Sequence, residues 1–211
     1  MLDEKVEEYC EFHTTPETDL LKKIFRETNL KVLNPRMLSG HLQGKLLEFF
    51  SILINPEQIL EIGTFTGYSA ICLAKGLKKD GVLHTIEKNI ELEDIILKNF
   101  NRAGIIKNTK LYIGNALDVI PEINKKFDLI FIDADKINLL NYYNFVFEKL
   151  NNGGLIIVDN VLWNKKVIEK IKPNDADTKA IKKFNDFVQN DERVENLMLP
   201  IRDGLMLIIK K

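Results

Sequence analysis

The sequence predicts an α/β fold with a seven-stranded, mostly parallel sheet, helices on both faces and a C-terminal antiparallel hairpin. Apolar runs of strand length alternate with helical patterns through the middle of the chain, which is typical of parallel sheets. One of these runs passes through a glycine-flanked turn into a helical pattern at residues 59–69. The last two apolar runs are joined only by a turn that contains Arg202-Asp203-Gly204, as in a hairpin.

The glycine-flanked turn is the best candidate for a ligand site. In an open parallel sheet, the loop after the first strand lies at the carboxyl edge, where ligands bind. Gly63 allows a sharp turn and a close approach of backbone to a ligand, and Gly67 opens the helix without a Cβ atom. We therefore expect a ligand at this turn.

The spacing of this turn indicates the class of ligand. Glu61, Gly63 and Gly67 do not form the Gly-x-Gly-x-x-Gly pattern that brings backbone amides to a pyrophosphate, so a dinucleotide is disfavoured. Glu87 ends the apolar run 82–87 and lies 20 residues beyond Gly67, where an acid that binds ribose hydroxyls is expected. Together these residues favour a nucleoside-type ligand over an ordinary turn with a solvated glutamate.

Composition describes one soluble globular protein. The chain has 211 residues, 45% hydrophobic and 29% charged, with a net charge of −1. The acidic N-terminus does not resemble a signal peptide, and Cys10 and Cys72 have no metal-binding spacing. We expect a cytoplasmic protein that is not associated with a membrane.

The chain divides into an N-terminal helical arm, residues 1–34, and a ligand-binding domain, residues 35–211. Thr15-Pro16 predicts a helix start with Thr15 as the N-cap. The helix that follows needs a surface to pack on, either the domain or a second subunit, and we expect a homodimer. A loop at 34–40 leads to a helix that Asn55-Pro56 ends.

The remaining elements follow in order. Helices are expected at 68–77, at 89–102, where Asn89 is the cap and Gly104 the stop, and at 139–150 and 177–190. Asn151-Asn152-Gly153-Gly154 is expected to break the chain before a strand. Strands are expected at 59–62, 82–87, 111–113, 127–133, 155–160, 194–200 and 205–209.

Oxygen-bearing side chains end two successive strands. Asp133 ends one strand, and Asp159 and Asn160 end the next. Successive parallel strands usually lie side by side, so these groups are expected to converge, and carboxylate and amide oxygens suit Mg²⁺, with Mn²⁺ or Ca²⁺ as alternatives. The competing interpretation is that each residue caps a turn or helix. Asp135 is either an outer carboxylate of this site or a surface turn residue.

Three motifs resemble one enzyme family in the same order. Glu61-Ile-Gly-Thr-Phe-Thr-Gly-Tyr-Ser69, Phe131-Ile-Asp-Ala-Asp-Lys136 and Asp159-Asn-Val-Leu-Trp163 are similar to the cation-dependent, S-adenosylmethionine-dependent O-methyltransferases. That family includes catechol and caffeoyl-CoA O-methyltransferases and small bacterial relatives. The resemblance runs from about Pro35 to the C-terminus. It implies a Rossmann-like class I methyltransferase fold, S-adenosylmethionine as cofactor and a divalent cation.

The resemblance also implies roles for individual residues. Lys136 would take the proton of the acceptor hydroxyl, and Asp133, Asp159 and Asn160 would bind the cation. The loop that carries Met37 would close over the methionine end of the cofactor. The cofactor-binding residues implied are Met37, Glu61, Gly63, Thr64, Gly67, Ser69, Glu87, Ala116, through its backbone N–H to the adenine, and Asp133. Taken alone, a solvated lysine and a gap-filling methionine remain the alternatives.

The acceptor is open between two chemistries. A small catechol-like molecule with vicinal oxygens would present its hydroxyl at the cation. Some bacterial relatives instead look like enzymes that methylate a hydroxyuridine in tRNA. Residues 161–183 carry seven lysines against three acids, an excess of four positive charges that could contact phosphates of RNA or of a CoA thioester, or form a solvated face.

A third possibility belongs to another class: a Rossmann-like nucleoside-binding protein without catalysis, or a dehydrogenase. The joint presence of Lys136 and the three oxygen ligands argues against the first. The missing third glycine argues against the second. Trp163 is either a wall for a flat substrate or a packing residue, and the sequence assigns no role to Arg202.

Overall fold

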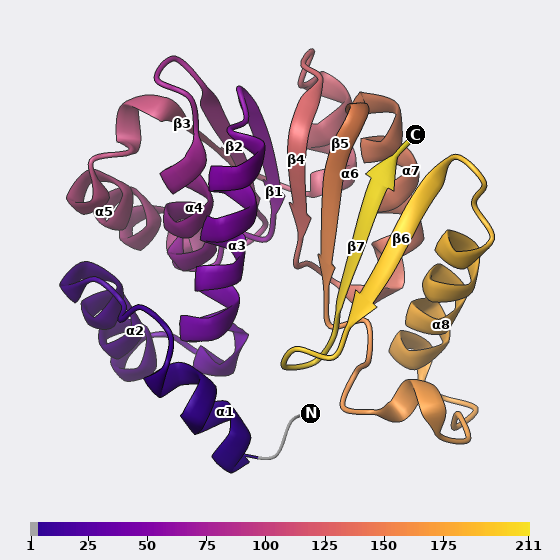
Figure 1. Ribbon diagram of the computed structural model, residues 1–211. Coiled ribbons are helices and arrows are strands. Elements are labelled where there is room, and N and C mark those ends of the chain that lie inside the picture. The colour runs from indigo at the N-terminus through magenta and orange to yellow at the C-terminus, as the bar shows by residue number, and fades with distance from the viewer. Residues whose placement is uncertain (1–3) are drawn as a thin grey trace.

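The computed structural model describes residues 4–211 and contains a seven-stranded sheet in the order β3-β2-β1-β4-β5-β7-β6 (Figure 1). Strands β1 to β5 are parallel, and β7 runs antiparallel to both β5 and β6. The strands are β1 Gln58–Ile62, β2 Val82–Glu87, β3 Thr109–Ile113, β4 Phe127–Ile132, β5 Leu150–Asp159, β6 Val194–Leu199 and β7 Leu205–Lys210. The predicted fold class is confirmed.

Helices cover both faces of the sheet (Figure 1). The α-helices are α1 Glu4–Phe12, α2 Asp19–Lys31, α3 Gly40–Ile54, α4 Tyr68–Leu73, α5 Glu93–Ala103, α6 Ala116–Glu122, α7 Leu139–Lys149 and α8 Ala176–Gln189. Short 3₁₀ turns are η1 Pro35–Met37, η2 Ala74–Gly76, η3 Ile90–Leu92, η4 Ile106–Asn108, η5 Lys136–Asn138 and η6 Lys166–Ile168.

The sheet separates two hydrophobic cores. Strand side chains alternate between its faces. Ile59 therefore packs with α2 to α5, and the next residue, Leu60, packs with α6 to α8. Both side chains are fully buried, as expected for a parallel strand covered on each side.

Helix α2 begins later than its sequence suggests. Its N-cap is Thr18, whose hydroxyl accepts a hydrogen bond from the Leu21 N–H at 3.3 Å, so the prediction of Thr15 as the cap was wrong. Thr15 lies in the link between α1 and α2, and its carbonyl accepts a hydrogen bond from His41 Nε2 at 2.9 Å. Leu21 is buried in the core on the α3 side, so the arm packs on the domain itself. The division at residue 34 stays a prediction.

The expected break before the fifth strand is a bulge inside that strand. β5 begins at Leu150, which pairs with Phe127 of β4, and the register resumes only at Leu155 with Leu129, so the Asn-Asn-Gly-Gly stretch bulges out of the ladder. Asn151 donates its side-chain N–H to Asp128 Oδ1 at 2.7 Å, which supplies a partner where the strand is irregular. The polar and glycine residues therefore interrupt the pairing with β4, although the strand begins before them.

None of the helices within residues 4–211 combines the length and apolar character that crossing a membrane requires.

Candidate functional site

The carboxyl ends of four parallel strands meet at one edge of the sheet, toward the bottom of Figure 1. The register pairs Ile62 with Ile86 and with Ile132, and Ile132 with Val158. The residues that follow these positions include Gly63, Glu87, Asp133 and Asp159. The structure therefore places the predicted glycine turn, ribose-binding acid and cation ligands along one edge.

Gly63 occupies a position where no side chain fits. Its φ is +99°, and a Cβ atom would lie 1.9 Å from the carbonyl oxygen of Asp133. Its N–H donates to the Ile86 carbonyl at 2.9 Å. The turn after β1 thus passes between the ends of β2 and β4 in direct backbone contact with the segment that carries Asp133.

Gly67 is needed for packing as well as for the turn. It has a φ of +85° and precedes α4, and a Cβ atom there would lie 2.7 Å from the Phe100 ring of α5. Its N–H donates to the Thr64 carbonyl at 2.9 Å, which closes the turn. Both glycines therefore give the loop its shape.

Glu61 and Ser69 lie beneath this loop, in a buried polar cluster. The Glu61 carboxyl accepts hydrogen bonds from Ser69 Oγ at 2.6 Å and Thr85 Oγ1 at 2.5 Å. Burial raises the pKa of Glu61 to about 8, although the two hydroxyl donors oppose that change. Thr64 Oγ1 lies 2.5 Å from Thr85 Oγ1 and extends the cluster into the loop. These hydrogen bonds connect the loop to β1, β2 and α4. Direct contacts of these residues with the cofactor stay predictions.

Glu87 ends β2 beside the same loop. Its Oε2 accepts the Phe65 N–H at 2.7 Å, and its Oε1 accepts the Asn89 N–H at 2.8 Å. The carboxylate thus joins the glycine turn to the start of the next helical segment. Each oxygen has a further lone pair, as ribose hydroxyls would require.

Ala116 is buried, whereas Met37 is exposed. Ala116 is the buried first residue of α6, so its N–H is among the helix amides that have no intrahelical acceptor. Met37 ends η1 with 57% of its surface exposed. The contact of Ala116 with the adenine and that of Met37 with the methionine end of the cofactor stay predictions.

The three predicted cation ligands lie at the adjacent carboxyl ends of β4 and β5. Burial, reinforced by the negative charge of Asp133, raises the pKa of Asp159 to about 7. Asp159 Oδ1 accepts the N–H of Asn160 at 2.6 Å, and Asn160 turns the chain with a φ of +63°. The Asp133 carboxylate is therefore near enough to oppose the ionisation of Asp159.

This donor set fits a divalent cation of the Mg²⁺ class. Two carboxylates and an amide carbonyl are hard oxygen ligands, and a cation between the carboxylates would remove their repulsion. Within residues 4–211, no three His, Cys, Asp or Glu side chains gather around a point that could hold a metal ion. A third protein ligand would therefore be an amide or backbone oxygen, and the Asn160 amide stays the predicted one.

Lys136 is buried beside these carboxylates. It is 7% exposed, and its Nζ lies 3.4 Å from Asp133 Oδ1. The same Nζ lies 5.9 Å from the centre of the Trp163 ring. Trp163 Nε1 is buried and has no hydrogen-bond partner in the described part of the chain. Lys136 thus lies between an acid and an aromatic face, away from bulk solvent.

Asp135 belongs to a surface turn. It caps η5, and its carboxylate accepts hydrogen bonds from the Asn138 N–H at 3.2 Å and the Tyr142 hydroxyl at 2.5 Å. Of the two predicted roles for Asp135, the structure supports the turn residue.

Sequence reasoning missed Gln43 and Arg202. Gln43 Nε2 donates to Asp159 Oδ2 at 2.6 Å, and Arg202 Nη1 donates to Gln43 Oε1 at 3.0 Å. A glutamine on the apolar face of a predicted helix was the available signal for Gln43. Arg202 gave none, because its partners lie 163 and 159 residues away in the chain.

Comparison with known proteins decides the family. An O-methyltransferase family profile matches residues 11–211. The chain belongs to this O-methyltransferase family. The predicted enzyme class, S-adenosylmethionine-dependent O-methyltransferase, is thereby confirmed.

Similar proteins agree with this assignment. Caffeoyl-CoA O-methyltransferase 1 of Eucalyptus globulus is 36% identical over 178 residues, 78% of this chain and 71% of the relative. Caffeoyl-CoA O-methyltransferase 5 of Nicotiana tabacum is 34% identical over 199 residues, 88% of this chain and 82% of the relative. The chain is therefore similar to caffeoyl-CoA O-methyltransferases over most of its length.

Solved structures share its architecture. The O-methyltransferase from Bacillus cereus in complex with SAH has a TM-score of 0.91 and 30% identity over 98% of this chain and 97% of that one. The O-methyltransferase TomG from Streptomyces achromogenes, in complex with SAM, has a TM-score of 0.90 and 26% identity over the full length of both chains.

Proposed function

We propose that this methyltransferase is cation-dependent and moves the methyl group of S-adenosylmethionine to a hydroxyl of a small, catechol-like acceptor with vicinal oxygens. The observation that carries this proposal is the convergence of Asp133, Asp159 and Asn160 beside the buried Lys136, at the edge that also holds the glycine turn. Asp133, Asp159 and Asn160 would hold the cation.

Lys136, in its neutral amine form, is the group that accepts the hydroxyl proton, and a divalent cation bound nearby would favour that form. As the acceptor oxygen forms its bond to the methyl carbon, the carbon–sulfur bond of the sulfonium breaks and the proton leaves for the lysine amine. A divalent cation at this position would supply the charge that favours loss of the proton. Asp133 and Trp163 hold the lysine at 3.4 Å and 5.9 Å, measured from its Nζ, which fixes the amine near the cation ligands.

The cofactor occupies the loop formed by Gly63 and Gly67, with its ribose at Glu87. Support comes from the shape of that loop and from the solved relatives that hold SAM or SAH. Because the carboxyl end of β4 adjoins the glycine turn, the sulfonium would face the cation ligands.

Lys136→Met tests the role of the lysine. We expect kcat to fall by about 10²- to 10⁴-fold, as for loss of a general base, while the Kd for S-adenosylmethionine measured by calorimetry stays unchanged. Lys149→Met, on a lysine whose Nζ donates to the Ile123 carbonyl at 2.8 Å, is the matched control and should leave kcat unchanged. Equal kcat values for wild type and Lys136→Met would remove the lysine from the mechanism.

A tRNA acceptor is the second candidate, favoured by the lysines of residues 161–183. Six of these seven side chains are exposed, and Lys166 pairs with Asp175 at 3.3 Å. Labelled S-adenosylmethionine offered side by side with a catechol and with undermodified bulk tRNA separates the two. We expect the labelled methyl group on the catechol. Label on the tRNA alone would show that the enzyme modifies RNA.

A further inference from the structure

The turn of the β6–β7 hairpin connects the two segments that flank the proposed cation ligands. On one side, the Leu162 N–H donates to the Asp203 carbonyl at 2.9 Å, and the Val161 N–H donates to the Gly204 carbonyl at 3.2 Å. A Cβ atom on Gly204 would lie 2.4 Å from Leu162, so this contact is tight. The hairpin turn is therefore fixed against the chain that leaves β5 immediately after Asp159 and Asn160.

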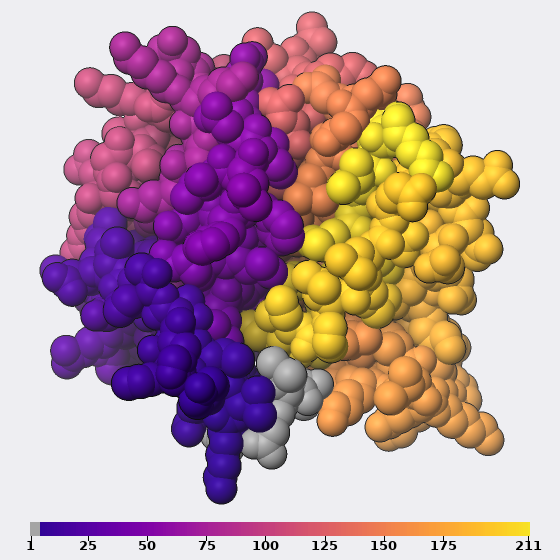
Figure 2. All heavy atoms as spheres, viewed as in Figure 1, coloured from indigo at the N-terminus to yellow at the C-terminus, as the bar shows by residue number. Residues whose placement is uncertain are grey.

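On its other side, the hairpin turn reaches α3 through Arg202. Figure 2 shows the hairpin against α3 on the viewed face of the molecule. Arg202 Nη1 donates to the Ser39 carbonyl and, at 3.0 Å, to Gln43 Oε1. Arg202 has a φ of +49°, a conformation that costs a non-glycine residue about 1 kcal/mol or more. The side-chain contacts with α3 offset that cost.

Arg202 determines which way the Gln43 amide points. A guanidinium group only donates hydrogen bonds, so the atom of Gln43 that faces it has to be the carbonyl oxygen Oε1. The amide nitrogen then faces Asp159, and Nε2 donates to Asp159 Oδ2 at 2.6 Å. Gln43 is fully buried, so water does not compete for either bond.

Asp159 is thereby held at both carboxylate oxygens. Gln43 binds Oδ2, and the Asn160 N–H binds Oδ1 at 2.6 Å. The Asp159 side chain is almost fully buried, so these donors define the plane of its carboxylate. Groups that bind a metal ligand in this way orient it and influence metal affinity.

We propose that Arg202 and Gln43 are positioning residues, which together orient Asp159 for the cation and connect the hairpin turn to the cation site. This inference rests on the proposed function, because it assumes that Asp159 binds a cation. Arg202 orients Asp159 through Gln43, so a variant that lacks Gln43 has already lost this orienting effect of Arg202 on cation binding.

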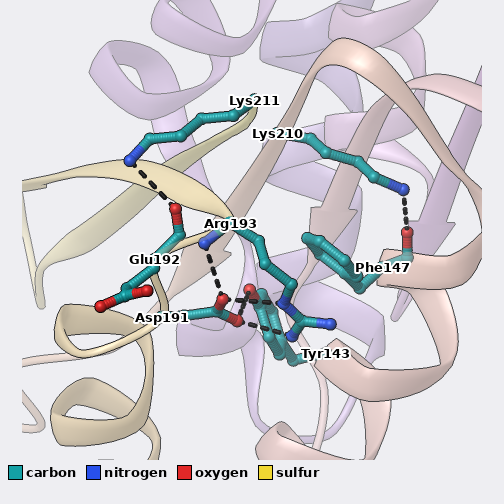
Figure 3. Close-up of polar contacts among 7 residues, drawn as sticks. All are labelled: Tyr143, Phe147, Asp191, Glu192, Arg193, Lys210 and Lys211. Carbon is teal, nitrogen blue, oxygen red and sulfur yellow. Dashed lines mark hydrogen bonds and ion pairs between the residues drawn. The ribbon is translucent and has the colours of Figure 1, made fainter.

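The test is a Mn²⁺ titration of the full chain without acceptor, in which the electron paramagnetic resonance signal of free Mn²⁺ gives the Kd. The variants are Gln43→Leu, Arg202→Met, the double variant, and Arg202→Lys as a conservative replacement. Arg193→Met is the matched control at the opposite end of the same hairpin, where Arg193 pairs with Asp191 through Nε at 2.8 Å and Nη2 at 2.7 Å (Figure 3).

We expect Gln43→Leu to weaken Mn²⁺ binding about 10- to 100-fold, as for other groups that orient metal ligands. Arg202→Met should weaken it by a smaller factor, Arg202→Lys should restore part of the loss, and the double variant should match Gln43→Leu alone. Arg193→Met should bind Mn²⁺ as the wild type does. The Kd for S-adenosylmethionine should stay constant throughout, and added Mn²⁺ should restore kcat.

Wild-type Mn²⁺ affinity in both single variants, or losses that add in the double variant, would overturn the inference and leave the proposed function intact. A wild-type protein that binds no Mn²⁺ would overturn the cation-dependent function and the inference with it. Thermal unfolding followed by circular dichroism identifies variants that fail to fold. If Gln43→Leu fails, Arg202→Met and Arg202→Lys at the partly exposed turn decide the matter.

Discussion

At the scale of single residues, the turn after β1 requires glycine at position 63, because a side chain there would collide with neighbouring backbone. Gly63→Ala would place a methyl group 1.9 Å from the Asp133 carbonyl, and backbone cannot move aside cheaply. We expect a loss of more than about 3 kcal/mol in the free energy of unfolding and a weaker Kd for S-adenosylmethionine.

Gly104→Ala is the control for that substitution. Gly104 also has a positive φ, +72°, but a Cβ atom there would meet nothing within 4 Å. Its cost should be about 1 kcal/mol from backbone conformation alone. Urea unfolding measures both variants, and equal losses would show that the close approach to Asp133 is unimportant.

Glu61 makes stability depend on pH. Burial raises its pKa from 4.5 to about 8, so the folded state keeps a proton that the unfolded state releases. The free energy of unfolding therefore falls as pH rises from about 5 to about 8, by at most about 1.4 kcal/mol per pH unit. Glu61→Gln should reduce this slope in urea unfolding at several pH values. Parallel pH profiles for wild type and variant would contradict a buried, protonated Glu61.

The positions of site residues at strand ends could be predicted from the sequence. Contacts between residues far apart in the sequence could not. Asp133, Asp159 and Asn160 directly follow or end apolar runs, so parallel topology alone places them together. Gln43 and Asp159 are 116 residues apart, and their contact depends on how α3 packs on the sheet. No local pattern encodes that packing.

At the scale of elements, helix caps set boundaries that periodicity leaves open. Thr15-Pro16 resembles a helix start, yet the helix begins after Thr18, whose hydroxyl accepts the Leu21 N–H. Thr18→Ala should lower the free energy of unfolding by about 1 kcal/mol, and Thr15→Ala, the control, should leave it unchanged. Thermal unfolding of both variants checks this, and a larger loss in Thr15→Ala would support the original sequence-based start.

The strand elements were largely predictable because both faces of the sheet are covered. Continuous apolar runs mark β1, β2 and β4, and their bounds agree with prediction to within one residue. The start of β5 was not predictable, because asparagine and glycine, which occupy positions 151–154, favour a turn locally. Leu150 pairs with Phe127 of β4 ahead of this stretch, which forms a bulge with the Asn151 contact to Asp128.

At the scale of the whole molecule, exposed apolar side chains on α3 agree with the expected homodimer. Phe49, Ile52 and Leu53 are 56%, 52% and 77% exposed. We propose that the protein dimerises, and sedimentation velocity at micromolar concentration should give twice the chain mass of 24.4 kDa. A monomer at every concentration would contradict the proposal.

The central claim is that a divalent cation at Asp133, Asp159 and Asn160 is needed for methyl transfer to a small acceptor. The most direct measurement is transfer of labelled methyl from S-adenosylmethionine to a catechol, with Mg²⁺, with EDTA, and with EDTA followed by excess Mg²⁺. We predict that EDTA abolishes transfer, that excess Mg²⁺ restores it, and that Asp159→Asn lowers the transfer measured with Mg²⁺. Transfer that continues unchanged in EDTA would contradict the claim.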